Sequence, residues 1–261
     1  MIFQSLSSGS SGNCVYIATE KTAILVDAGF SGKQIEKLMR TSGLSPKDLD
    51  AIFITHEHGD HTQGCGVLSR RYDIPIYANQ GTWQAMKKRI GRIAKKNTQI
   101  FQSDLFFDFK DLRVFPFSIH HDAQEPVGFS FENEEGKLAV LTDTGFVDDS
   151  MMDAIVDSNI YYIEANHDVD LLLEGPYPEL LKQRILSEKG HLSNKQVANI
   201  LLDLYRGGEY IFLAHMSIEN NDESLCYDTV KDTLEAEGLL CQDQIQVAPR
   251  SQPSRLVQVL S

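Results

Sequence analysis

The sequence of 261 residues is long enough for one α/β domain, and no linker rich in proline, glycine or serine separates its two halves. We therefore expect a single domain over residues 1–261. Apolar residues make up 42% and charged residues 23%, as in folded globular proteins, which excludes disorder as the main state. The formal net charge of −13 excludes a surface that binds nucleic acid everywhere, because phosphate binding depends on lysine and arginine.

The sequence has no feature of an exported or membrane protein. Residues 1–12 contain no basic leader followed by an apolar run, and no apolar segment approaches the roughly 20 residues that span a bilayer. We therefore expect a cytoplasmic protein. Its four cysteines are scattered and form no C-x-x-C pair, so we expect reduced thiols rather than a disulfide framework or a cysteine zinc site.

The first half of the chain alternates short apolar strands with helices. We predict a strand before the glycine and serine loop Ser7–Gly12, and further strands at Cys14–Ala18, Ala23–Val26, Ala51–Thr55 and Ile76–Ala78. Helices are predicted at Gly32–Arg40, Gly64–Tyr72 and Thr82–Ile93. The first of these helices carries Ile35, Leu38 and Met39 at helical spacing.

Strands dominate residues 99–142, and helices alternate with strands after that. The predicted strands are Leu112–Ile119, Val127–Glu132, Leu138–Thr142, Ile160–Glu164 and Tyr210–Ala214, with short ones near Ile245–Val247 and Arg255–Val259. The predicted helices are Met151–Asp157, Pro178–Ser187, Ser193–Tyr205 and Asp222–Glu237. This order predicts two sheets packed together and covered outside by helices. No internal repeat is visible, although the two halves could be similar in three dimensions.

One basic run interrupts the acidic sequence. Six cations fall within ten residues: Lys87, Lys88, Arg89, Arg92, Lys95 and Lys96. Such a run could contact phosphate, or it could be a solvated helix face without a partner.

The densest group of ligand-type residues follows the apolar strand Ala51–Thr55. Its sequence is His56-Glu57-His58-Gly59-Asp60-His61, with three of the chain's eight histidines. Imidazole and carboxylate are ligands suited to Zn, Mn and Fe, and a short turn after a strand can direct several of them at one point. His56 and His58 project together from an extended stretch, whereas Asp60 and His61 can reach a second, adjacent ion.

This segment resembles the H-x-H-x-D-H signature of the metallo-β-lactamase superfamily. The resemblance implies a four-layer αβ/βα sandwich, with two mixed sheets flanked by helices and the metal site at one edge. It also implies three further ligands downstream, each after a strand. His121, Asp143 and His215 fit these positions, with Asp143 bridging the two ions; His120 competes with His121 for the first. The implied metal ligands are His56, His58, Asp60, His61, His121, Asp143 and His215.

Segments without metal ligands resemble one bacterial branch of the superfamily, the YycJ/WalJ/VicX proteins, nearly end to end. They are Leu6–Asn13, Glu164–Asp168, Gly175–Pro178 and Gly190–Asn194. This resemblance implies a DNA exonuclease that works from the 5′ end, with nucleic acid as substrate. The proposed cofactors are two divalent ions, Zn, Mn or Fe, and a metal-bridging hydroxide that Asp60 orients would attack the phosphate.

Five other residues are candidates for contact with the substrate. His191 lies before a predicted helix and could hold the phosphate or protonate the leaving oxygen, or else be an incidental part of a capping loop. His167 could support the metal site or be purely structural. Tyr177 and Lys182, with the neighbouring Arg184, could contact nucleic acid, although such side chains commonly pack or face solvent.

Other functions remain open at this stage. The same metal centre could hydrolyse a thioester, a lactone or a small phosphodiester, because fold does not settle function. A non-enzymatic, metal-bound signalling adaptor would need the ligands but not His191. The sequence leaves the oligomeric state open.

Overall fold

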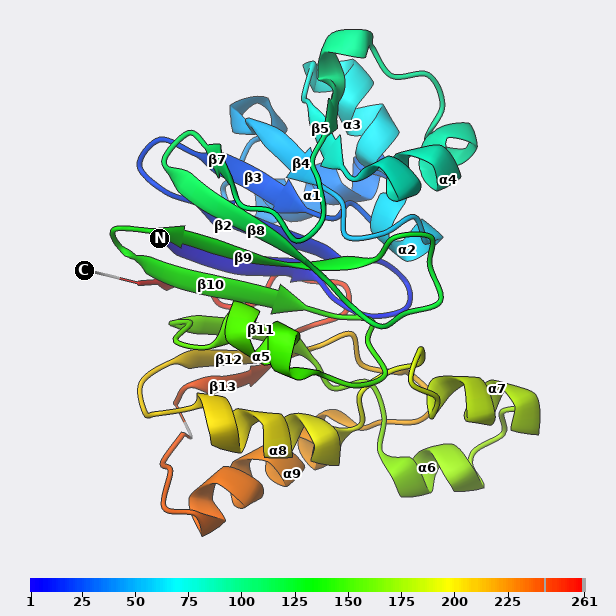
Figure 1. The fold of residues 1–261 in the computed structure, drawn as a ribbon, viewed down its shortest axis with the longest axis vertical. Coiled ribbons are helices and arrows are strands. Elements are labelled where there is room, and N and C mark those ends of the chain that lie inside the picture. The colour runs from blue at the N-terminus through cyan, green and yellow to red at the C-terminus, as the bar shows by residue number, and fades with distance from the viewer. Residues whose placement is uncertain (242, 260–261) are drawn as a thin grey trace.

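The computed structural model describes residues 1–241 and 243–259. Two sheets face each other, and helices cover their outer faces, which gives four layers (Figure 1). The strands of the first sheet lie in the order β14 (Val257–Gln258), β1 (Ile2–Ser7), β2 (Cys14–Ala18), β3 (Ala23–Val26), β4 (Ala51–Phe53), β5 (Ile76–Ala78) and β6 (Thr98–Ile100). Those of the second lie in the order β13 (Ile245–Val247), β12 (Tyr210–Ala214), β11 (Ile160–Glu164), β10 (Gly136–Leu141), β9 (Val127–Asn133), β8 (Leu112–Ser118) and β7 (Phe107–Phe109).

Both sheets follow the same pattern of antiparallel and parallel strand pairs. In the first, neighbours from β14 to β3 are antiparallel and neighbours from β3 to β6 are parallel. In the second, neighbours from β7 to β10 are antiparallel and neighbours from β10 to β13 are parallel. The halves are therefore alike in topology, with β3 and β10 in equivalent places. The parallel strands bring their carboxyl ends to one edge.

Helices cover the outer face of each sheet. The first sheet carries α1 (Gly32–Thr41), α3 (Cys65–Tyr72) and α4 (Gln80–Ile90), and the second carries α5 (Asp149–Ile155), α8 (Asn194–Leu204) and α9 (Glu223–Ala236) (Figure 1). Short helices are α2 (Gly59–Thr62), α6 (Val169–Glu174) and α7 (Glu179–Ile185); single 3-10 turns are η1 (Pro46–Asp48) and η2 (Lys95–Asn97).

Most predicted elements are present within a few residues of their expected ends. The predicted helix Thr82–Ile93 ends earlier, at Ile90, because Gly91 takes a positive φ of 77° that stops a right-handed helix. Helix α6 was not expected; the Asp168 side chain caps its short N-terminus. α8 begins with a capping box between Ser193 and Gln196.

The apolar core forms three clusters, one at each of the three interfaces between the four layers. Phe53 of β4 and Phe129 of β9 belong to the cluster between the sheets, where their ring centroids lie 5.8 Å apart. A second cluster joins the first sheet to α1, α3 and α4, and a third joins the second sheet to α5, α8 and α9. Because apolar burial is the main stabilising force of a fold, both sheets are held rigid beneath the edge where their loops meet.

The four cysteines are free and buried, as expected from their spacing. In the part of the chain that the structure describes, no helix combines the length and the apolar character needed to cross a membrane.

Candidate metal centre

Ligand-type side chains gather at one edge of the two sheets, after the ends of their strands. His56 and His58 follow β4, Asp60 and His61 lie in α2, and His121, Asp143 and His215 follow β8, β10 and β12. β10, β11 and β12 are parallel neighbours, so the residues after them emerge at the same edge.

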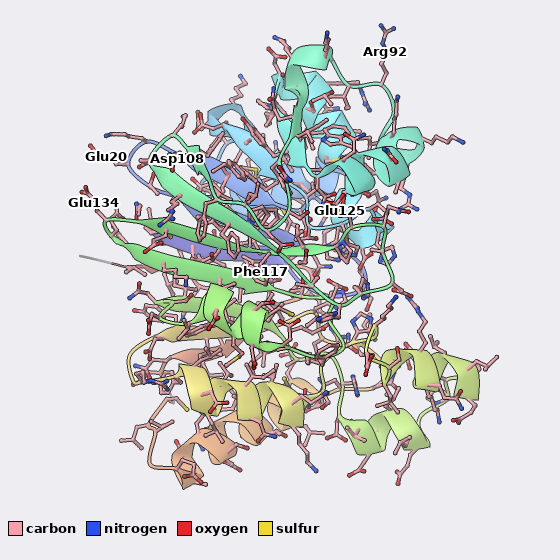
Figure 2. The ribbon with its side chains drawn as sticks, in the orientation of Figure 1. Glu20, Arg92, Asp108, Phe117, Glu125 and Glu134 are labelled. Atoms are coloured by element: carbon pink, nitrogen blue, oxygen red, sulfur yellow. The ribbon has the colours of Figure 1, made fainter. Side chains whose placement is uncertain are left out.

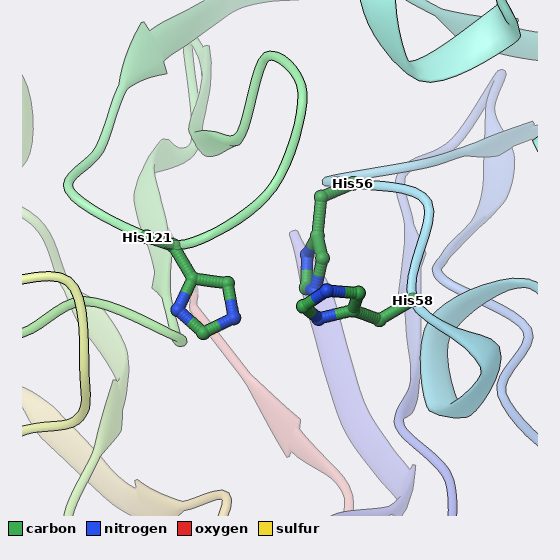
Figure 3. Close-up of side chains that lie close together, drawn as sticks. All are labelled: His56, His58 and His121. Atoms are coloured by element: carbon green, nitrogen blue, oxygen red, sulfur yellow. The ribbon is translucent and has the colours of Figure 1, made fainter. Parts of the chain in front are cut away.

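Three histidines form the first cluster. One ring nitrogen of each of His56, His58 and His121 lies within 4.8 Å of the others. The ring centroids of His56 and His58 are 4.6 Å apart, and those of His58 and His121 are 5.1 Å apart. Figure 3 shows the rings of His56 and His58 facing that of His121 across the gap between their loops. This arrangement offers three nitrogen ligands to one ion.

A second cluster lies beside the first. It contains ligand atoms of Asp60, His61 and His215 within 4.8 Å of one another. The Asp143 carboxylate is placed between the clusters: Oδ2 is 3.3 Å from His61 Nε2, and Oδ1 is 3.4 Å from His215 Nε2 and 3.8 Å from His121 Nε2. Asp143 can therefore serve both clusters.

The residues present fit divalent metal ions. His56 Nε2 and His121 Nδ1 are buried, and neither has a hydrogen-bond partner among the residues described. Buried polar atoms in native proteins are almost always paired, so these nitrogens need a ligand. Asp143 and His215 also take left-handed backbone angles, with φ of 61° and 50°. Non-glycine residues rarely do so, and such strain clusters at functional sites.

The charges of the cluster favour a cation. Burial alone would lower the pKa of His61, but Asp27, Asp143 and Asp60 outweigh it and raise this pKa well above its usual value. The pKa of His215 is likewise raised, against burial, chiefly by Asp143. The carboxylates thus favour protons on the His61 and His215 rings. A metal ion could replace these protons, since a proton and a metal ion both supply positive charge.

Two buried carboxylates support the ligands from behind. Asp27 Oδ2 lies 2.7 Å from His61 Nδ1, and the Thr55 hydroxyl and backbone N–H donate to the same carboxylate at 2.9 Å. Glu164 Oε1 lies 2.8 Å from Nδ1 of both His215 and His191. A carboxylate on Nδ1 orients the ring and leaves Nε2 for metal, the usual arrangement of metal-binding histidines.

A pocket of about 280 Å³ opens over the clusters. His58, Asp60, His121, Asp143 and His215 line its floor, and the remaining lining residues are Ser10, Asn166, Tyr177, Leu181, Arg184, Ile185, His191 and Ser217. A small polar substrate could reach the ligand atoms through this opening.

Comparison with known proteins identifies the chain's relatives. The family model for the metallo-β-lactamase superfamily matches residues 8–189. The protein named exodeoxyribonuclease YycJ of Bacillus anthracis is 43% identical over 237 residues, which cover 90% of each chain. The chain belongs to the YycJ/WalJ branch of the metallo-β-lactamase superfamily. A second member of this branch, named exodeoxyribonuclease WalJ of Streptococcus pneumoniae, is 44% identical over 232 residues, covering 88% of this chain and 86% of the relative.

Solved structures confirm the superfamily's fold. The metallo-β-lactamase fold protein YhfI from Bacillus subtilis matches with a TM-score of 0.72 at 15% identity, covering 98% of this chain and all of that one. The short form of human tRNase Z matches with a TM-score of 0.67 at 18% identity over the whole of both chains. At such identities the likeness concerns the fold alone.

Within this branch, the structure separates the two candidates for the first downstream ligand. His121 joins His56 and His58. His120 turns away: its Nε2 lies 2.7 Å from Asp148 Oδ2, and its ring stacks on Phe146 with 4.0 Å between centroids. The geometry therefore favours His121 as ligand.

Some of the predicted substrate-contacting residues line the pocket and others do not. His191 and Tyr177 line the pocket, as does Arg184, whose Nε donates to Asp122 at 2.6 Å. Lys182 does not, because its stem is buried and its ammonium donates to the carbonyl oxygen of Leu173 in α6. His167 is buried behind the pocket, where burial lowers its pKa to about 4, so its ring is neutral.

Sequence reasoning missed the supporting carboxylate Asp27, and it named Glu164 only within the segment Glu164–Asp168, beside the candidate His167. A signal for Asp27 was present: Asp27-Ala28-Gly29 after β3 parallels Asp143-Thr144-Gly145 after β10. Glu164 lies in a segment that carries the family resemblance, but nothing in the sequence indicated which histidines its carboxylate contacts.

Proposed function

We propose that this chain is a metal-dependent exodeoxyribonuclease that hydrolyses phosphodiester bonds of DNA from a 5′ end. The observation that carries the proposal is the pair of ligand clusters joined by Asp143, beneath a pocket that His191, Tyr177 and Arg184 line. The names of two relatives in the same branch, at 43% and 44% identity, support DNA as the substrate.

The donor set suits two divalent ions. His56, His58 and His121 would hold one, and Asp60, His61 and His215 the other, with Asp143 shared. Nitrogen and oxygen donors without thiolate suit Zn, Mn or Fe. When bound, such ions activate water and neutralise charge on phosphate oxygens.

The chain's own residues perform the remaining steps. Asp60, whose pKa is held far below its usual range by His61 and His215 despite burial, stays ionised and accepts a hydrogen bond from the attacking water. As a bond forms between this water oxygen and phosphorus, the water loses one proton to the surrounding solvent, and the bond from phosphorus to the ester oxygen breaks.

His191 donates a proton to the leaving ester oxygen. Its Nδ1 is held by Glu164 at 2.8 Å, while the ring borders the pocket. Arg184 and Tyr177 would bind the phosphate and the adjacent sugar or base, since an arginine is a strong phosphate ligand and an aromatic ring can stack on a base. We place this activity in the cytoplasm, where the four free cysteines would stay reduced.

The test is turnover of metal-loaded protein on a panel of substrates: duplex DNA labelled at either end, single-stranded RNA, a small phosphodiester and a thioester. We expect duplex DNA to shorten from the 5′ end, with release of the 5′ label before the 3′ label. Loss of the 3′ label first would contradict the polarity, and turnover of the thioester alone would contradict the nuclease proposal.

A further inference from the structure

A second and larger hollow lies beside α4, outside the metal pocket. It has a volume of about 880 Å³ and runs between α4 and the segment 91–100 that leads to β6. Its cationic walls are formed by Lys87, Lys88, Arg92 and Lys95, and Trp83 and Ile93 contribute apolar surface. We call it the α4 groove. Among the residues described, no aspartate or glutamate lines it.

The cations of the α4 groove lack protein partners. Of the six cations in the basic run, Arg89 donates to the carbonyl oxygen of Glu57 at 2.8 Å, and Lys96 pairs with Asp73. The four that line the groove are exposed, and within the described part of the chain none makes an ion pair. Figure 2 shows the Arg92 side chain extending away from the ribbon.

This concentration of positive charge contrasts with the rest of the molecule. The chain has a net charge of −13, yet within the described residues no acidic side chain lines this groove. Four like charges around one hollow repel one another and attract a polyanion.

Two hydrogen bonds connect α4, which forms one wall of the α4 groove, to the loops of the metal centre. Glu57, which accepts the hydrogen bond from Arg89, stands between the ligands His56 and His58. The Glu57 carboxylate in turn accepts from the N–H of Gln124 at 2.9 Å, in the loop that carries His121. Helix α4, which carries Lys87 and Lys88, is therefore hydrogen-bonded to one ligand loop and through it to the other.

We propose that the α4 groove binds the sugar–phosphate backbone of the DNA substrate, several nucleotides away from the end that lies at the metal centre. This inference rests on the proposed exonuclease function. The lysines and arginine would neutralise successive phosphates, and the apolar wall would contact sugars or bases. An exonuclease gains from such a site because the strand stays bound while its end is shortened.

The test compares two quadruple variants with the same change of charge. The groove variant carries Lys87→Gln, Lys88→Gln, Arg92→Gln and Lys95→Gln. The control variant carries Lys33→Gln, Lys37→Gln, Arg40→Gln and Lys47→Gln, at exposed positions in or near α1 that line neither hollow. Binding of metal-loaded protein to a labelled 30-base-pair duplex is measured against salt concentration.

We expect the groove variant to bind the duplex at least about tenfold more weakly at 0.1 M salt, with a shallower salt dependence, because each lost phosphate contact removes roughly one unit of slope. Its KM should rise for the long duplex and not for a small phosphodiester. The control variant should bind like the wild type. Equal losses in both variants, or no loss in the groove variant, would overturn the proposal.

Binding without catalysis keeps the two proposals separable. Trp83 is the chain's single tryptophan and lines the groove, so its fluorescence should change when DNA binds, even with the metals removed by chelation. If the fluorescence change depends on the groove cations but the metal-loaded protein has no nuclease activity, the result would support the groove proposal and contradict the proposed exonuclease function. Binding of anionic phospholipid vesicles in place of both single-stranded and duplex DNA would overturn the groove proposal.

Discussion

Asp27 and Asp143 occupy equivalent positions in the two sheets. Each follows the strand at which antiparallel pairing changes to parallel, β3 in one sheet and β10 in the other. Both have a φ of 61°, and each stands two residues before a glycine. Their roles differ: Asp143 lies between the ligand clusters, whereas Asp27 lies behind one ligand and holds His61 Nδ1.

Replacing Asp27 should weaken metal binding although Asp27 is not itself a proposed ligand. In Asp27→Asn, the amide no longer carries the negative charge that orients and polarises His61, so we expect metal affinity to fall about 10–100-fold. Competition with a chromophoric chelator measures this. Asp148→Asn is the matched control, because Asp148 holds His120 at the same 2.7 Å outside the clusters. Equal affinities in both variants would contradict the role given to Asp27.

Gly29 leaves room for the loop that carries Asp60. A Cβ at Gly29 would lie 1.6 Å from the carbonyl oxygen of Asp60, so Gly29→Ala must displace this ligand. We expect a loss of metal affinity and a destabilisation of about 1–3 kcal/mol, as for an overpacked core. Gly59→Ala is the control, since the nearest atom to its Cβ is Arg89 Nη1 at 3.5 Å. Chemical denaturation and metal titration of both variants test the difference, and a metal-competent Gly29→Ala protein would refute it.

His191 should affect turnover more than metal content. General acids contribute about 10²–10⁴-fold to rate, so kcat of His191→Ala on DNA should fall by this factor while bound metal stays at the wild-type level. A nitrophenyl phosphodiester has a leaving group that needs no proton, and its hydrolysis should fall much less. Equal losses on both substrates would assign His191 to phosphate binding instead of proton donation.

Much of the fold follows from the sequence because apolar strands and amphipathic helices repeat at distinct periods. The likeness of the halves was hidden, since it consists mainly of pairing directions, and its one repeated pattern is the short Asp-x-Gly after β3 and β10. The cluster His56 to His61 stands out in the sequence itself, because four ligand-type residues follow an apolar strand; His121, Asp143 and His215 were implied by the resemblance to the superfamily, and the structure brings all seven together. Lys182 could not be placed: only the packing of α7 against α6 decides that its ammonium meets the carbonyl of Leu173. Glu164 could be named but not given its contacts, because a buried acid at a strand end has no sequence pattern that shows which side chains it holds.

Metal binding should release protons near neutral pH. In the metal-free site, carboxylates outweigh burial and raise the pKa of His61 and His215 well above 6.5, so both rings are protonated at pH 7. A metal ion must displace these protons, and apparent affinity therefore falls as pH decreases. Titration calorimetry in two buffers of different ionisation enthalpy counts the protons. Fewer protons should be released when metal binds to Asp27→Asn. A heat of metal binding that is the same in both buffers would contradict this prediction.

The most direct test of the central claim is anomalous diffraction from crystals of the protein loaded with manganese or zinc. We expect two peaks about 3.5–4 Å apart, as in two-metal sites. One should lie among His56, His58 and His121, the other among Asp60, His61 and His215, and Asp143 should contact both. A single peak, or peaks away from Asp143, would contradict the shared two-metal centre on which the proposed nuclease rests.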